Sequence, residues 1–272
     1  MKIMKSLCTA TILSATVLAA SMTQAIAANQ LEQAIAGEQR SDKNKARDQY
    51  RHPQQTLAFF GFNSTMTVVE IAPGGGWYSE ILAPALKGSG TFYGAHYPDT
   101  GKDDYYSKSR RKLEAKLASD AVFSEMKLSN FTPKVASELA PAGTADLVLT
   151  FRNLHNWGEE GVKQVFIDSF KALKPGGFLG VVEHRMPASQ SWKDNSRSGY
   201  FPAKIVLDLA ASAGFKLAAS SEVNANAKDT ANYEKGVWTL PPVLRLGDKD
   251  KAKYLAIGES DRMTLKFVKP AK

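Results

Sequence analysis

Three consecutive glycines, Gly74, Gly75 and Gly76, follow a β-branched segment and precede apolar residues at helical spacing. A turn without side chains lets a ligand approach the backbone amides and the positive end of the following helix. Glu70 closes the preceding segment, where its carboxylate can accept a hydrogen bond from a ligand amine or hydroxyl. The pattern favours a ligand-binding loop, and a tight left-handed turn without a ligand is the alternative.

Three of the four histidines, His96, His155 and His184, lie at or just after the predicted end of a strand. Histidines gathered on one face suit proton removal near neutral pH, and His155 is the strongest candidate for a base. A structural hydrogen bond to the backbone is the alternative for each of them.

A metal site is the second chemistry that these histidines could support. His155 and His184 could combine with Glu183 or Glu70 into a histidine and carboxylate site. No His-x-x-x-His or similar local spacing supports it. We therefore expect no metal.

Two arginines, Arg152 and Arg185, follow strands that we expect to be adjacent and parallel. Both side chains could therefore reach an anionic group, one on a cofactor carboxylate and the other on an acidic substrate. Salt bridges to Glu70 or Glu183 are the alternative.

The segments around these residues alternate between strand and helix patterns, which indicates an α/β fold. Continuous apolar strands joined by helices predict a doubly wound, mostly parallel sheet with helices on both faces and an antiparallel C-terminal strand. Right-handed crossovers bring the carboxyl ends of the parallel strands to one side, where such sheets bind ligands. We expect seven strands, at residues 67–72, 91–96, 121–128, 145–150, 178–184, 215–223 and 263–268, and helices over 77–87, 103–117, 161–173 and 201–213.

The sequence pattern divides the chain into three parts. Residues 1–27 form a predicted signal peptide, residues 28–64 a helical cap that could lie over the ligand face, and residues 65–272 the α/β domain. The cap is interrupted around His52, which precedes a proline. Residues 224–262 are polar and loop-rich, and we interpret them as an insertion near the sheet edge rather than a second domain.

The signal peptide prediction rests on Lys2 and Lys5, on a mostly apolar stretch over residues 7–20, and on the small-x-small sequence Ala25-Ile26-Ala27. The stretch is short and rich in Thr, Ser and Ala, so we expect export and cleavage rather than a stable membrane anchor. The mature protein would be periplasmic or secreted. The single cysteine, Cys8, lies in the removed segment, which excludes disulfides and cysteine nucleophiles afterwards.

Charge and composition limit the classes of binding partner that we expect. The 272 residues are 43% hydrophobic and carry a formal charge of +8, spread along the chain. The densest basic patch, residues 108–116, is interleaved with Glu114 and suits a solvated helix face better than a nucleic-acid groove. We expect a small-molecule substrate and no nucleic acid, and no pattern indicates an oligomeric state.

Three segments together resemble class I S-adenosylmethionine-dependent methyltransferases, in particular a group of exported predicted methyltransferases. EIAPGGGWYSE, residues 70–80, is similar to their first motif; ADLVLTFRNLHNW, residues 145–157, to their fourth strand and its loop; and ALKPGGFLGVVEHR, residues 172–185, to their fifth strand. The resemblance covers roughly residues 45–270. The G-x-G-x-x-G spacing of dinucleotide dehydrogenases is absent, because Ser79 stands at the third position.

The resemblance implies a Rossmann-like seven-stranded fold, S-adenosylmethionine as the cofactor, and methyl transfer to an O, N or S acceptor. His96 stands where the family usually has an acid that binds both ribose hydroxyls. A non-catalytic periplasmic ligand-binding protein on this fold is the alternative function. The expected cofactor-binding residues are Glu70, Ala72, Gly74, Gly75, Gly76, His96, Asn130 at the adenine, and Phe151, and the expected catalytic residues are Arg152, Asn153, His155 and His184.

Overall fold

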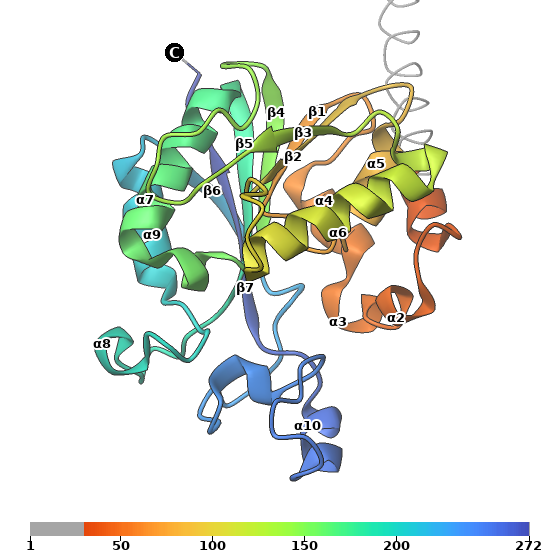
Figure 1. Cartoon of the computed structure of the whole chain (residues 1–272). Helices are drawn as coiled ribbons and strands as arrows, with labels where there is room; N and C mark the ends of the chain where they lie inside the picture. Colours follow the sequence, from red (N-terminus) through yellow and green to blue (C-terminus); the bar gives the residue numbers. More distant parts are fainter. Residues whose placement is uncertain (1–29, 272) are drawn as a thin grey trace, which may run out of the picture.

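A computed structural model of the chain describes residues 30–271, so the predicted signal peptide and Cys8 lie outside the described residues. Its centre is one seven-stranded sheet with strand order β3-β2-β1-β4-β5-β7-β6 (Figure 1). The first five strands pair in parallel, and β7 runs antiparallel to β5 and β6. The predicted fold class is confirmed. The strands are β1 (Thr67–Ile71), β2 (Thr91–His96), β3 (Lys127–Asn130), β4 (Ala145–Phe151), β5 (Leu173–His184), β6 (Lys216–Ser221) and β7 (Arg262–Val268).

Helices cover both faces of the sheet, because the central strands carry apolar residues on both sides. One face packs against α4 and α5, and the opposite face against α7 and α9. Residues 30–36 are also helical. The remaining bounds are α2 (Asp42–Lys45), α3 (Asp48–Arg51), α4 (Pro53–Phe60), α5 (Ser79–Leu86), α6 (Tyr105–Ser119), α7 (Leu154–Ala172), α8 (Trp192–Asn195), α9 (Ala203–Ser212), α10 (Lys251–Ile257), and the 3₁₀ turns η1 (Ala121–Phe123) and η2 (Gly236–Thr239). No helix in residues 30–271 is long and apolar enough to cross a membrane.

The cap segment breaks where the sequence predicts. His52 has a left-handed backbone (φ 41°) between α3 and α4, and α4 starts at Pro53. Helix α4 packs on the sheet itself: a Cβ at Gly180 of β5 would lie 2.8 Å from a ring carbon of Phe60. Gly180 therefore provides the space that Phe60 occupies.

Two sequence predictions need correction. The predicted third strand over residues 121–128 begins instead as η1, because the Asp120 carboxylate accepts a hydrogen bond from Val122 N (2.8 Å) and caps that turn. Strand β3 starts only at Lys127. Helix α7 begins with a short turn at Leu154 and is interrupted at Gly158, whose backbone is non-helical (φ 65°), so helical structure starts seven residues before the predicted start at Gly161.

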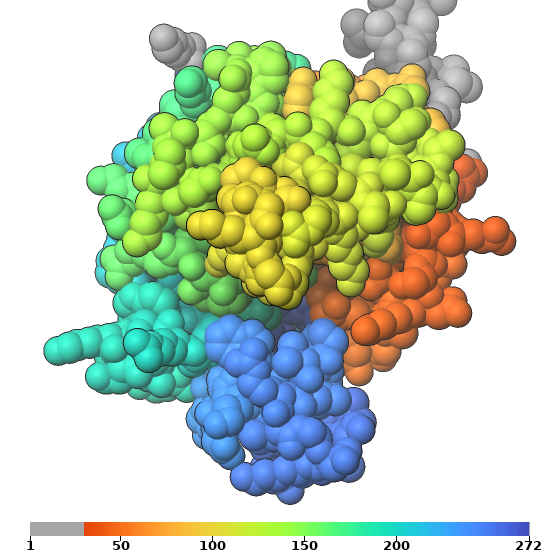
Figure 2. All heavy atoms as spheres, viewed as in Figure 1, coloured from red at the N-terminus to blue at the C-terminus, as the bar shows by residue number. Residues whose placement is uncertain are grey.

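The insertion connects β6, the edge strand of the sheet, to β7. Strand β7 begins with Arg262 opposite His184, the last residue of β5, so the chain between β6 and β7 emerges at the carboxyl ends of the parallel strands. It forms a lobe with α10 that projects beyond the sheet (Figure 1), and in Figure 2 this lobe lies below the body of the molecule. Because β7 runs antiparallel to β5, the lobe lies at the carboxyl ends of the parallel strands.

Candidate active site

Two residues at the carboxyl ends of the central strands have left-handed backbones although they are not glycine. Ala72 after β1 has a φ of 50°, and Arg152 after β4 has a φ of 59°. Such conformations cost about 1–3 kcal/mol each and cluster at ligand sites. Asn153 joins the two loops, since its Nδ2 lies 3.2 Å from Ile71 O and 3.4 Å from Ala72 O. The two strained loops are thus held together as one wall.

Two cavities open on either side of this wall. The first, which we call the inner cavity, has a volume of about 420 Å³ and extends from the end of β2 to the lobe. The second, the cap cleft, has a volume of about 770 Å³ and lies between the glycine loop and the cap helices α2 and α3. Ala72, Gly74 and Asn153 line both cavities. Of the other predicted site residues, the inner cavity takes His96 and His155, and the cap cleft takes Gly75, Phe151 and Arg152.

The other four predicted residues, Glu70, Gly76, Asn130 and His184, line neither cavity. Glu70 is buried and accepts a hydrogen bond from Ser79 Oγ (2.6 Å). Burial raises the pKa of Glu70 to about 7, although the Ser79 hydrogen bond and the charge of Arg152 act in the opposite direction. Asn130 lies at the exposed end of β3.

A buried carboxylate organises the start of α7. Glu183, the penultimate residue of β5, accepts hydrogen bonds from Leu154 N (2.6 Å) and His184 N (2.7 Å), and Leu154 opens α7. The carboxylate therefore caps a helix N-terminus from a neighbouring strand, where the helix dipole favours negative charge. This cap explains the early start of α7.

The same carboxylate orients His155. The distance between His155 Nδ1 and Glu183 Oε1 is 3.0 Å, and both side chains are almost completely buried. An ionised carboxylate only accepts, so Nδ1 carries the proton and Nε2 is left as the basic nitrogen. Because His155 also lines the inner cavity, the pair has the geometry of a general base held by a carboxylate.

His184 lies next to this pair. Its ring centroid is 5.3 Å from that of His155, and its Nδ1 is 2.5 Å from Ser260 Oγ. Burial and the neighbouring His155 lower the pKa of His184 well below its ordinary value, so the ring is neutral near pH 7. The sequence spacing gave no sign of a metal site, yet one ligand atom each from His155, Glu183 and His184 lie within 4.8 Å of one another. Both Glu183 oxygens accept hydrogen bonds, so this carboxylate holds both the start of α7 and the His155 ring in place.

His96 is held by the protein at both ring nitrogens. Nδ1 lies 3.2 Å from Tyr97 O and Nε2 lies 3.2 Å from Ser109 Oγ. A carbonyl oxygen only accepts, so Nδ1 donates and Nε2 accepts from the serine hydroxyl. Burial lowers the pKa of His96 and keeps the ring neutral.

Aromatic residues that sequence reasoning missed form a wall of the inner cavity. The rings of Tyr97 and Tyr106 lie 4.0 Å apart, and Trp157 donates from Nε1 to Tyr97 Oη (2.7 Å). The lobe contributes Trp238, whose ring lies under the guanidinium of Arg245 at 4.9 Å. Tyr106 occurs in a charged helix and Trp238 in a loop-rich segment, so their sequence surroundings do not distinguish them from residues of a solvated surface.

The two arginines expected near an anion have different environments. Arg185 forms ion pairs with Asp261 and Glu222, both at 2.7 Å. Arg185 therefore forms salt bridges, but with partners other than Glu70 and Glu183. Within residues 30–271, the guanidinium of Arg152 forms no hydrogen bond or ion pair. Arg152 is thus the arginine that remains available to a ligand.

Comparison with known proteins identifies the fold. The structure is similar to a methyltransferase from Aquifex aeolicus described as dependent on S-adenosylmethionine (TM-score 0.56, 13% identity, 82% of this chain and 93% of that chain). It is similar to one from Methanosarcina mazei (0.52, 12%, 79% and 98%) and to the (4+2) cyclase SpnF (0.56, 14%, 92% and 96%). No family model and no curated protein matches the sequence. The fold is that of class I S-adenosylmethionine-dependent methyltransferases, and at these identities the likeness concerns the fold alone.

Proposed function

We propose that this protein transfers the methyl group of S-adenosylmethionine to a small-molecule acceptor. The observation that carries the proposal is the convergence of the glycine loop, Asn153 and the His155–Glu183 pair on one cavity at the carboxyl ends of the strands. The shared fold supports it.

The glycine loop has room for such a cofactor. A Cβ placed on Gly74 or Gly75 would meet no atom within 4 Å, so the loop has open space beside its backbone. Bound S-adenosylmethionine would supply a methyl group activated by a sulfonium. Gly74 and Gly75 would offer backbone contacts to it, while Asn153 fixes the loop position.

In this scheme His155 removes the proton. A bound methyl donor would lose its methyl group to the acceptor atom and keep the electron pair on sulfur, and His155 Nε2 would take the acceptor proton. Glu183 stabilises the imidazolium that forms, because its carboxylate faces Nδ1 at 3.0 Å. The two residues thus act as base and positioning group.

Calorimetry with S-adenosylmethionine and S-adenosylhomocysteine tests the proposal. We expect both to bind the purified protein, and Gly75→Leu to weaken both by filling the open space at the loop. An unchanged melting temperature of the variant would show that the fold is retained. Absence of binding by either compound at millimolar concentration would contradict the function.

One observation favours a second candidate, a non-catalytic ligand-binding protein on the same fold. Both ring nitrogens of His96 already have hydrogen-bond partners within the protein. His96 therefore has fewer hydrogen-bonding groups available to a ribose than a carboxylate would have. Native mass spectrometry of the protein from its own host separates the two. A co-purifying ligand without adenosine supports the second candidate, and S-adenosylhomocysteine supports methyl transfer.

The basic start, apolar stretch and small-x-small sequence of residues 1–27 support the further proposal that the protein is exported. Cell fractionation and N-terminal sequencing of the recovered protein test it. We expect the mature chain to begin at Ala28 outside the cytoplasm, and an intact Met1 in the cytoplasm would contradict export.

A further inference from the structure

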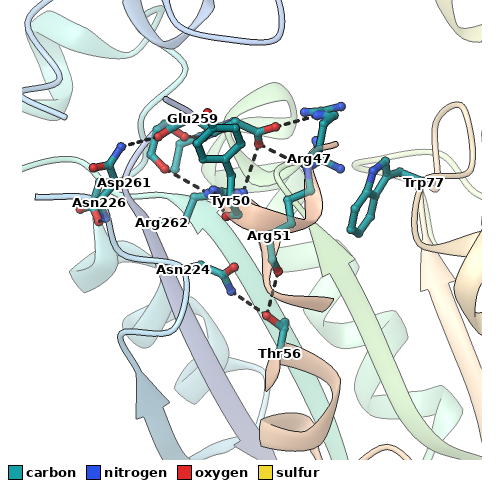
Figure 3. A network of polar contacts seen from close by, with 12 residues as sticks. Arg47, Tyr50, Arg51, Thr56, Trp77, Asn224, Asn226, Glu259, Asp261 and Arg262 are labelled. Atoms are coloured by element: carbon teal, nitrogen blue, oxygen red, sulfur yellow. Dashed lines mark hydrogen bonds and ion pairs between the residues drawn. The ribbon is translucent and has the colours of Figure 1, made fainter. Parts of the chain in front are cut away.

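The cap and the lobe meet in a cluster of arginines around one carboxylate. Glu259 Oε1 lies 2.6 Å from Arg47 Nε, while Oε2 lies 3.3 Å from Arg51 Nε and 3.3 Å from Arg262 Nη1 (Figure 3). Burial alone would raise the pKa of Glu259, but Arg51, Arg262 and Arg47 outweigh it and hold that pKa at about 2. One permanently ionised carboxylate thus faces three arginines.

Arg152 adds a fourth positive charge to this cluster. Burial and the neighbouring Arg152 lower the pKa of Arg51 well below its ordinary value, which reports the mutual repulsion of the two side chains. Burial also lowers the pKa of Arg152, to about 10, so Arg152 remains protonated at neutral pH. Arg51 is also a cation, because a guanidinium keeps its proton in proteins. The cluster therefore carries more positive charge than Glu259 neutralises.

Two of these arginines line the cap cleft and have unused hydrogen-bonding capacity. Arg51 is 3% exposed and lines the cleft, and its Nη1 is buried without a partner in residues 30–271. Arg152 lines the same cleft and forms no ion pair within the described chain. An uncompensated buried cation is destabilising by several kcal/mol, which an anion in the cleft would relieve.

The position of Arg51 is fixed by its surroundings. Its guanidinium lies over the Trp77 ring, 4.5 Å from the centroid, and Trp77 Nε1 donates to Asn44 O (3.1 Å). Thr56 Oγ1 donates to the Arg51 carbonyl (3.1 Å). Figure 3 shows the side chain held between Trp77 and Glu259. The site is therefore built before any ligand arrives, which lowers the entropy lost on binding.

The remainder of the cleft has the same sign of charge. Six basic and three acidic side chains line it, an excess of three positive charges among the described residues. One of the acids, Glu80, is already paired with Lys116. Low-dielectric walls of one sign concentrate ligands of the opposite charge.

The cofactor does not account for this excess. S-adenosylmethionine carries a sulfonium, an ammonium and one carboxylate near neutral pH, so it brings a net positive charge. We propose that the cap cleft binds a carboxylate or phosphate group of the methyl acceptor, with Arg51 and Arg152 as its direct ligands. The inference rests on the proposed function, and it places the acceptor anion beside Ala72, Gly74 and Asn153, which line both the cleft and the inner cavity that contains His155.

Calorimetric titration with inorganic phosphate tests the site, first on the free protein and then on protein saturated with S-adenosylhomocysteine. We expect binding in both states. Arg152→Gln should weaken phosphate binding about 10- to 100-fold, since hydrogen bonds to charged groups contribute about 1.5–3 kcal/mol. Arg152→Lys should retain part of the affinity. Arg197 is exposed and lies outside the cleft, so Arg197→Gln removes the same charge and should leave the affinity for phosphate unchanged.

Three results would overturn the inference. Phosphate could fail to bind, it could bind wild type and Arg152→Gln equally, or S-adenosylhomocysteine could displace it while 5′-methylthioadenosine does not. The last result would assign the arginines to the cofactor carboxylate. Arg51→Gln is a second variant if Arg152→Gln does not fold. Failure of S-adenosylhomocysteine to bind would contradict methyl transfer, whereas the titrations of free protein would still decide the anion site.

Discussion

Replacement of Glu70 by glutamine should stabilise the protein at alkaline pH. Burial raises the pKa of this carboxyl from 4.5 to about 7 in the folded state, and unfolding returns it to water. Between these values the folded chain holds a proton that the unfolded chain has released. Stability conferred by the protonated form is therefore complete below pH 4.5 and lost as the pH rises through 7.

The magnitude follows from the same two values. One pKa unit corresponds to about 1.4 kcal/mol, so the full shift is about 3 kcal/mol, of which about 2.5 kcal/mol is lost between pH 5 and pH 8. Glutamine is uncharged at every pH and can still accept the hydrogen bond that Ser79 Oγ donates at 2.6 Å. The variant should therefore lack this pH dependence.

Urea unfolding of wild type and Glu70→Gln at pH 5, 6, 7 and 8 measures the effect. We expect the free energy of unfolding of the variant, relative to wild type, to rise by about 2.5 kcal/mol across this range. Glu138→Gln replaces an exposed acid and should show no such trend. A difference that stays constant with pH would refute the reasoning and show that Glu70 is ionised in the folded protein.

Four further substitutions test the site and its supports. His155→Asn should lower the kcat of methyl transfer about 10²- to 10⁴-fold, measured as release of S-adenosylhomocysteine, and should leave the affinity for S-adenosylhomocysteine unchanged. Glu183→Gln should lower kcat too and should also lower the melting temperature, because the cap of α7 loses its negative charge. An unchanged kcat in His155→Asn would exclude it as the base. Gly180→Ala should lower the free energy of unfolding by about 1–3 kcal/mol, since its Cβ would lie 2.8 Å from a buried ring. Gly75→Ala is the control, because a Cβ at Gly75 has open space around it. Equal losses of unfolding free energy in the two variants, measured in urea, would contradict this packing. Glu259→Gln should lower that free energy by about 3–5 kcal/mol by leaving the arginines uncompensated, and added phosphate should restore part of it; a neutral effect would contradict the charge balance.

The strand ends could be placed from the sequence because apolar runs of strand length alternate with helical patterns. The ends that carry Ala72, His96, Arg152 and His184 all fall on one side of the sheet, as right-handed crossovers require. Residues of the glycine loop and of the loop after β4 were therefore predicted together. The two loops lie side by side because of the strand order, and the alternation of strand and helix patterns in the sequence predicts that order.

The supporting contacts could not be predicted in the same way. Arg47 and Glu259 form an ion pair across 212 positions of sequence, and both occur in polar segments that resemble solvated surface. Glu183 was visible as a polar residue at the end of an apolar strand, but its hydrogen bond to His155 depends on how β5 lies beside β4. Such pairings depend on how distant segments pack together, and the hydrophobic periodicity within one segment does not predict them.

A crystal structure of the protein with S-adenosylhomocysteine bound tests the central claim most directly. We predict that the ligand lies along the glycine loop, with its sulfur near Asn153 and its adenosine in the inner cavity beside His96 and Tyr97. Density for a different molecule in that cavity, or S-adenosylhomocysteine bound away from the loop, would contradict the account.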